Sequence, residues 1–161
     1  RKTVENALVN LDSEDLNVEV KNGKVYISLS ENLLFPSASA SLNKEGKEAI
    51  GTLGKVLLEN PDINIDVVGH TDSLAINTAR YSDNWDLSVA RATTITRLLT
   101  EESGVPGKRL TASGMSDFSP VATNSTKEGR AKNRRTEIIL TPKLEELFKI
   151  LDGSETTEVT E

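Results

Sequence analysis

Two residues of opposite charge, Asp72 and Arg91, stand at positions from which they could hold a charged ligand. Asp72 ends an apolar run that begins at Ile63, and Arg91 lies near the start of a helical pattern, and both kinds of position often carry binding groups. Arg91 shares a helical stripe with Leu87 and Ile95, which should face a core. Because burying an unpaired charge is costly, we expect an acidic side chain or an anionic ligand close to Arg91.

The residue types leave two interpretations of this pair open. In one, Asp72 and Arg91 form an internal salt bridge that joins a loop to a helix. In the other, both side chains bind a ligand, and the strand end at 69–72 and the helix start at 87–92 form one concave site. If the pair is kept for a ligand, we expect its side chains to be only partly buried while no ligand is bound.

Composition argues against several classes of function. A net charge of −6 argues against nucleic acid as a partner, since that binding rests on basic patches. The chain has no cysteine and a single histidine, so we expect no metal and no cofactor. His70, Asp72 and Ser73 are residue types of a hydrolytic triad, but close neighbours cannot readily adopt its geometry, so we expect no catalytic residue. No stretch approaches the ~20 apolar residues that cross a bilayer, and the chain begins at Arg1 without a leader, so any membrane anchor should lie outside it.

Hydrophobic periodicity predicts the order of the elements. Strands with alternating apolar residues are expected over 16–20 and 25–29, joined by a hairpin turn at Asn22-Gly23. The remaining patterns predict a helix that starts at an Asn43 cap and ends near Asn60, a strand over 63–68, a polar loop over 73–83, a helix over 85–102, strands over 109–114 and 136–140, a helical turn over 127–131, and a closing helix that starts at Pro142.

This order of elements predicts an α/β (α+β) sandwich, in which a mixed sheet has helices packed on one side. We expect one domain over residues 16–151. A linker or the end of an upstream helix should precede it over 1–15, and a disordered acidic tail should follow it over 152–161.

From about Leu33 to Leu140 the sequence resembles the OmpA-like domain, the peptidoglycan-associating module of bacterial outer-membrane proteins, lipoproteins and flagellar stators. Five blocks of residues occur in the order of that family. They are the small-residue loop Phe35–Leu42, Gly69-His70-Thr71-Asp72, Asn84–Ala92, Gly104-Val105-Pro106 followed by Leu110–Gly114, and Gly129–Glu137.

The resemblance implies a ligand and the residues that hold it. In the family, the aspartate and arginine that match Asp72 and Arg91 hold diaminopimelate, the branched amino acid of the peptidoglycan stem peptide. Diaminopimelate has a free end with an ammonium, which Asp72 could accept, and a carboxylate, which Arg91 could grip with two N–H donors. Arg134 would supply a second positive group, Asn84 would cap its helix or hydrogen-bond the ligand, and Thr71 would offer a hydroxyl or backbone group.

Around this site the chain also differs from many relatives. They carry an acidic residue directly after the phenylalanine that matches Phe35, where this chain has Pro36. The long loop between Asp72 and Arg91 is similar to that of the flagellar stator subgroup and of some outer-membrane proteins. Arg135 is expected to be a solvated residue at a strand end rather than a ligand contact.

The function implied by the resemblance is that of a non-catalytic module, which binds the diaminopimelate of the stem peptide and tethers an envelope protein to the cell wall. Its place would be the periplasm, as part of an outer-membrane or envelope-anchored protein, with a membrane reached only through an N-terminal anchor outside the given sequence. The alternative is a wall-anchoring structural module of a flagellar-type motor stator, and an enzyme is a third, weaker interpretation. A homodimer stays open.

Overall fold

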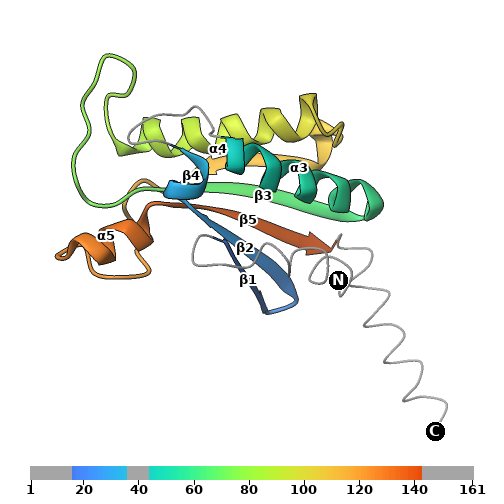
Figure 1. Ribbon diagram of the computed structural model, residues 1–161, viewed down its shortest axis with the longest axis horizontal. Helices are drawn as coiled ribbons and strands as arrows, with labels where there is room; N and C mark the ends of the chain where they lie inside the picture. The colour runs from blue at the N-terminus through green and yellow to red at the C-terminus, as the bar shows by residue number, and fades with distance from the viewer. Residues whose placement is uncertain (1–15, 36–43, 143–161) are drawn as a thin grey trace, which may run out of the picture.

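The computed structural model describes residues 16–35 and 44–142 (Figure 1). The predicted linker over 1–15, the Asn43 cap and the predicted acidic tail lie outside the described residues. The closing helix expected after Pro142 also lies outside them. Its expected first residue is wrong, because Pro142 is the last residue of strand β5 (Arg135–Pro142).

Five strands in the described part of the chain form one mixed sheet, in the order β1-β2-β5-β3-β4. Besides β5, the strands are β1 (Leu16–Lys21), β2 (Lys24–Ser30), β3 (Ile63–His70) and β4 (Leu110–Gly114). β3 and β4 pair in parallel, because a helix crosses between them, and the other neighbours pair antiparallel. Asn22 and Gly23 have φ angles of 55° and 76°, the left-handed conformation that a tight hairpin turn requires, so the predicted hairpin is confirmed.

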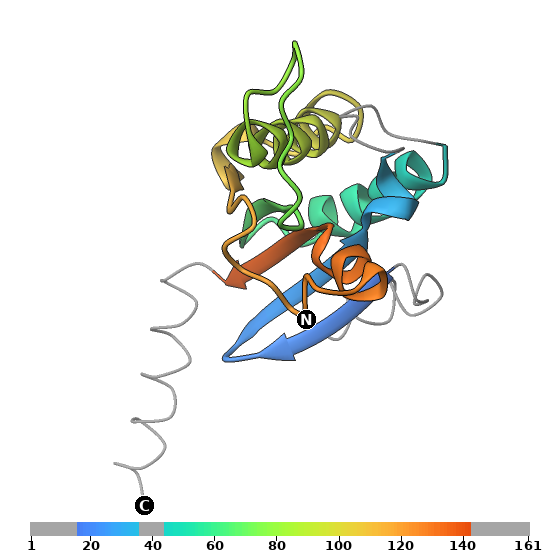
Figure 2. The same cartoon turned by 90° about the vertical axis from the view of Figure 1, so that its left-hand side faces the viewer.

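Two helices cover one face of the sheet, as Figures 1 and 2 show. They are α3 (Lys44–Glu59) and α4 (Asn84–Glu101), both close to the predicted ranges. The shorter elements of the described residues are α2 (Glu31–Leu34), the 3₁₀ helix η1 (Gly107–Arg109) and α5 (Lys127–Asn133). The predicted fold class, an α+β domain with a mixed sheet, is confirmed, whereas α2 is not among the predicted elements.

The hydrophobic core lies between the sheet and these two helices. Residues alternate along β2, so that Ile27 is buried while its neighbour Tyr26 is partly exposed. The helices contribute Ile50, Leu53, Leu57, Ile95 and Leu99, each 2% exposed or less. Burial of these apolar side chains holds α4 against β3 and β4, and the end of β3 leads into the loop that lines the pocket described below.

Arg109, expected in a strand, is instead a buried clamp at the end of η1, with 6% of its surface exposed. Its guanidinium donates hydrogen bonds to the backbone carbonyls of Leu57, Asn60 and Ile63 at 3.0, 2.7 and 3.0 Å. These carbonyls lie at the end of α3 and the start of β3. Arg109 therefore satisfies acceptors that a helix end leaves without a helical partner, and it fixes the turn between the two elements.

Candidate ligand-binding site

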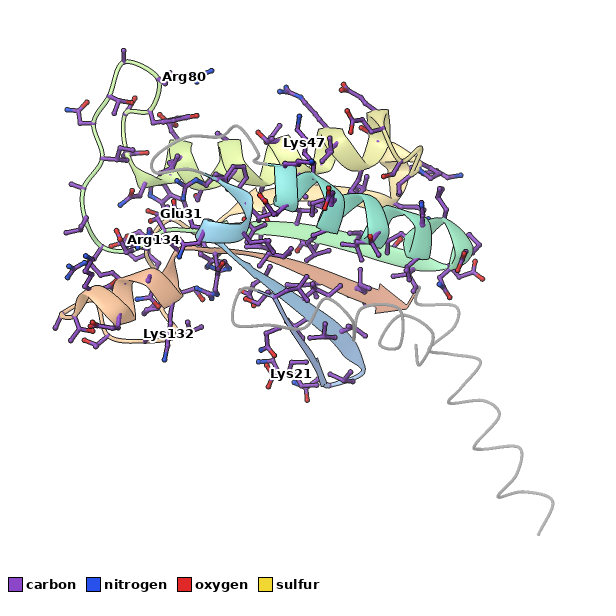
Figure 3. The ribbon with its side chains drawn as sticks, in the orientation of Figure 1. Lys21, Glu31, Lys47, Arg80, Lys132 and Arg134 are labelled. Carbon is purple, nitrogen blue, oxygen red and sulfur yellow. The ribbon has the colours of Figure 1, made fainter. Side chains whose placement is uncertain are left out.

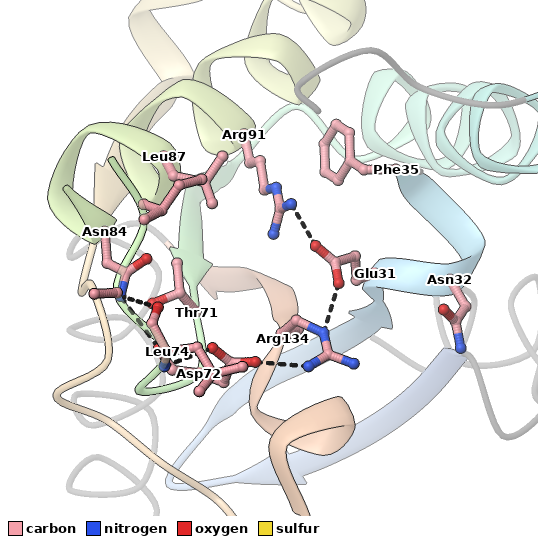
Figure 4. Close-up of a pocket in the computed structure, with 12 residues that line it drawn as sticks. Glu31, Asn32, Phe35, Thr71, Asp72, Leu74, Asn84, Leu87, Arg91 and Arg134 are labelled. Atoms are coloured by element: carbon pink, nitrogen blue, oxygen red, sulfur yellow. Dashed lines mark hydrogen bonds and ion pairs between the residues drawn. The ribbon is translucent and has the colours of Figure 1, made fainter. Parts of the chain in front are cut away.

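A pocket of about 540 Å³ opens between the end of β3 and the start of α4 (Figure 4). It is lined by every site residue that the sequence predicts, namely Thr71, Asp72, Asn84, Arg91 and Arg134. The other lining residues are Glu31, Asn32, Phe35, Leu74, Ala75, Ile76 and Leu87. The strand end and the helix start thus surround one hollow, while ligand binding by these residues stays a prediction.

Two glycines let α4 approach the sheet closely enough to form this pocket. A Cβ atom on Gly69 would lie 2.0 Å from the carbonyl oxygen of Ser88, and one on Gly114 would lie 2.4 Å from the Ser88 hydroxyl oxygen. Neither distance leaves room for a side chain, so both positions require glycine. Arg91, one turn further along α4, is thereby held near the end of β3.

Side chains on both sides of the loop after β3 hold its backbone in place. The Thr71 hydroxyl donates to the carbonyl of Asp72 at 2.9 Å. The Asn84 amide donates to the carbonyls of Asp72 and Leu74 at 3.3 and 3.0 Å, which ties the loop to the first residue of α4. The capping role considered for Asn84 falls to Asp83, whose side chain accepts a hydrogen bond from a first-turn amide at 3.0 Å.

Arg91 is buried and paired with an acid. It is 3% exposed, and Asp72 is 6% exposed, so the expectation that both side chains are only partly buried without a ligand is wrong. Arg91 Nη2 forms an ion pair with Glu31 Oε1, and the guanidinium lies 5.4 Å from the centre of the Phe35 ring, within reach of a cation–π interaction. The acidic partner that a buried arginine requires is therefore Glu31, a residue that is not among those predicted from the sequence.

Arg134 connects Glu31 to Asp72, and Figure 3 labels Arg134 and Glu31 next to each other at the end of the sheet where α2 lies. Its Nε lies 2.6 Å from Glu31 Oε2, and its Nη1 lies 2.6 Å from Asp72 Oδ2. The side chains of Arg91, Glu31, Arg134 and Asp72 therefore form a row of alternating charge, called the charge row below (Figure 4). Both members of the predicted pair are held by ion pairs, Asp72 by Arg134 and Arg91 by Glu31.

The two arginines of the charge row keep their charge. Burial lowers the pKa of Arg91, and the charge and hydrogen bond of Glu31 oppose this effect. Burial acts in the same direction on Arg134, but the hydrogen bonds and the negative charges of Asp72 and Glu31 outweigh it and raise the pKa of Arg134. Both guanidinium groups stay protonated at neutral pH, because the pKa of arginine lies far above neutrality.

Helix α2 carries Glu31 into the pocket. The backbone amide of Glu31 donates to the carbonyl of Arg134 at 3.0 Å, so the two residues are joined through backbone as well as side chain. A Cβ atom on Gly46 would lie 2.8 Å from the carbonyl oxygen of Leu33, which shows that α3 packs directly on α2. The sequence predicts that an acidic group lies close to Arg91, but it does not identify Glu31 as that group.

A second polar cluster joins β5 to the end of β3. Arg135 is 7% exposed, so the expectation of a solvated side chain is wrong. Its Nη2 donates to Glu137 Oε1 and to the carbonyl of Ser119, both at 3.1 Å. The same Oε1 lies 2.6 Å from Nε2 of the buried His70. The short contact with His70 and the charge of Arg135 lower the pKa of Glu137, although burial opposes them.

The described residues hold neither a cluster of metal-ligating side chains nor a membrane-spanning helix. Within residues 16–35 and 44–142, no group of three or more histidine, cysteine, aspartate and glutamate side chains is placed to hold a metal ion. No helix in the same part of the chain combines the length and the apolar character that a membrane span requires.

The mixed sheet, the helices on one face and the charged pocket define a small α+β domain, and comparisons with known proteins give its family. The model of the OmpA family matches residues 34–134, well over half of the chain. Motility protein B of Bacillus subtilis is 34% identical over 128 residues, which are 80% of this chain and 49% of that protein. Peptidoglycan-binding protein ArfA of Mycobacterium tuberculosis is 34% identical over 108 residues, which are 67% of this chain and 32% of that protein.

A solved structure shares the fold. It is described as the cell wall anchor of the T6SS from Pseudomonas aeruginosa, with a TM-score of 0.80 and 36% identity, and the match covers 87% of this chain and 97% of that chain. The chain therefore belongs to the OmpA family, and the resemblance predicted from the sequence is confirmed. It spans about half or less of the length of the two curated relatives.

Proposed function

We propose that this domain binds peptidoglycan without catalysis, through the diaminopimelate of the stem peptide, and so tethers an envelope protein to the cell wall in the periplasm. The observation that carries the proposal is the charge row inside a pocket, where acidic and basic side chains alternate within reach of one small ligand. The names of two relatives, a peptidoglycan-binding protein and a cell wall anchor, support it.

The ends of the charge row match the two charges of the ligand. Asp72 would accept the ammonium of diaminopimelate, and Arg91 would donate to its carboxylate with the planar, two-pronged geometry of a guanidinium. Arg134 lies between them and can share its donors between Asp72 and the ligand. Phe35 and Leu87 line the same pocket and offer apolar surface to the methylene chain of the ligand.

Thr71 and Asn84 would act on the ligand through the loop that they hold. Both donate to the carbonyl of Asp72, which fixes the backbone from which the carboxylate projects. Oδ1 of Asp72 also accepts from the backbone amide of Leu74 at 2.9 Å, which orients the carboxylate. A preorganised carboxylate loses little conformational freedom when it binds an ammonium. Recognition of a whole zwitterion would also let an acidic domain bind an anionic polymer.

A second candidate function is the wall-anchoring module of a motor stator, which the similarity to Motility protein B favours. The two candidates share the wall contact and differ in what is attached to the domain. A membrane-spanning helix with a charged residue upstream of the given sequence would favour the stator. A lipid-attachment cysteine or another outer-membrane anchor would favour the passive tether.

The proposed function is tested by pull-down with purified cell-wall sacculi that contain diaminopimelate. Asp72→Asn keeps the side-chain shape and removes the charge, and we expect it to weaken binding by roughly 30- to 150-fold, because a ligand ammonium loses its charged partner. Arg91→Ala should weaken binding to a similar degree, whereas Arg97→Ala, an exposed arginine on the same helix, should not. Soluble diaminopimelate should compete, and lysine, which lacks the second carboxylate, should compete poorly.

Equal retention of the wild type and of Asp72→Asn at matched salt would contradict the proposal. Sacculi whose stem peptides carry lysine in place of diaminopimelate serve as the ligand control and should be bound weakly. Incubation of the domain with muropeptides, followed by mass spectrometry, tests the absence of catalysis, and any new product would contradict that part of the proposal.

A further inference from the structure

Glu31 lies between the two arginines of the charge row. Its Oε1 pairs with Arg91 and its Oε2 pairs with Arg134, so its carboxylate bridges both arginines of the pocket. The Glu31 side chain is 11% exposed, and the residue lines the pocket. Its position is set by its backbone, since its amide donates to the carbonyl of Arg134 and its carbonyl accepts from the amide of Phe35 at 2.7 Å.

This bridge decides the charge of the pocket. Two guanidinium groups, of Arg91 and Arg134, face two carboxylates, of Glu31 and Asp72, so the charges of the row balance. Without Glu31 the same pocket would carry one net positive charge. Such a pocket would depend on the ligand for a second carboxylate, because a buried guanidinium requires an anion.

The free end of diaminopimelate can present two forms to this pocket. With a free carboxylate it is a zwitterion, and with that carboxylate converted to a carboxamide it carries one positive charge. A carboxamide has an oxygen that accepts hydrogen bonds and an NH₂ group that donates them. An arginine beside a glutamate offers a donor and an acceptor, which matches the carboxamide, while a free carboxylate would be attracted by the arginines and repelled by Glu31.

We propose that Glu31 is a specificity-determining residue, which neutralises Arg91 and Arg134 and thereby lets the pocket bind the amidated form of diaminopimelate at least as tightly as the free-carboxylate form. The inference rests on the proposed function and adds the chemical form of the ligand. Asp72 would hold the ammonium in both forms, and the difference between the forms lies at Glu31 and its two arginines.

The test compares two stem peptides that differ only in amidation of the diaminopimelate carboxylate. Isothermal titration at one ionic strength gives the affinity of each peptide for the wild type and for Glu31→Gln. We expect the wild type to bind the amidated peptide within about threefold of the free one, or more tightly. Glu31→Gln should shift the ratio of affinities toward the free-carboxylate peptide by about tenfold, a coupling in the range observed for groups in contact.

Two control variants separate charge from structure. Glu101→Gln changes the net charge by the same amount at the exposed last residue of α4, and it should leave the ratio at the wild-type value. Glu31→Asp keeps the charge on a shorter side chain, and it should also stay close to the wild-type ratio even if both affinities fall. Thermal melts with each peptide confirm that the variants are folded during the titration.

The outcomes distinguish this inference from the proposed function. A Glu31→Gln protein that binds both peptides with the wild-type ratio of affinities would overturn the inference alone, and Glu31 would then have a structural role. A wild type that prefers the free-carboxylate peptide by more than about tenfold would also overturn it. A wild type that binds neither peptide would refute the proposed function, and this inference with it.

Discussion

Replacement of Arg91 by alanine tests how much the charge row contributes to stability. Arg91 is 3% exposed and loses its ion pair with Glu31 and its contact with the Phe35 ring in this variant. Breaking a buried ion pair by removing one partner costs about 3–5 kcal/mol. Because Arg134 still holds the Glu31 carboxylate, we expect the lower end of this range, a loss of about 3 kcal/mol in the free energy of unfolding.

Urea denaturation followed by circular dichroism measures this loss, provided that the dependence of the free energy on urea concentration is unchanged. Arg97→Ala is the matched control, since Arg97 is exposed on the same helix, and its effect should stay within about 0.5 kcal/mol. A loss below about 1 kcal/mol for Arg91→Ala would refute the conclusion that Arg91 and Glu31 form a buried ion pair, because a solvent-exposed ion pair contributes about 1 kcal/mol or less to stability. A loss of the expected size means that Arg91 has a structural role in addition to any contact with a ligand.

Two further predictions concern clusters outside the pocket. Arg109→Ala removes three hydrogen bonds to backbone carbonyls and should lower the free energy of unfolding by about 2–4 kcal/mol. Lys108→Ala, at the exposed neighbouring residue, should have little effect on this free energy. Similar losses for the two variants would contradict the conclusion that Arg109 stabilises the turn between α3 and β3. The pKa of Glu137 is lowered in the folded protein by His70 and Arg135, so this carboxylate stabilises the fold above the usual glutamate pKa of about 4.3. The stability advantage of the wild type over Glu137→Gln, measured by chemical denaturation, should therefore be full at neutral pH and disappear as the pH falls through the lowered pKa. An advantage that does not change with pH would contradict this linkage.

The sequence by itself determined the features that depend on local patterns. The hairpin at Asn22-Gly23 follows from two residues that tolerate positive φ between alternating strands, and the main helices follow from a spacing of apolar residues such as Leu87 and Ile95. The resemblance to the family predicted that Arg91 shares one site with four other residues, and the structure places all five around one pocket. The other four are Thr71, Asp72, Asn84 and Arg134. The position of Arg91 on the same helical face as Leu87 and Ile95 also predicted that an acidic group would neutralise its buried charge.

The tertiary structure alone decided which acid that is. Helix α2 has four residues, too few for a helical period to be visible in sequence, and its Glu31 meets Arg91 and Arg134 from distant parts of the chain. The burial of Arg109 and Arg135 was not visible in the sequence either, because it depends on which backbone carbonyls the fold brings within reach of each guanidinium. The sequence does not identify the partner of a charged side chain when the two residues are far apart along the chain. Such an ion pair depends on the distance between the two groups in the folded protein.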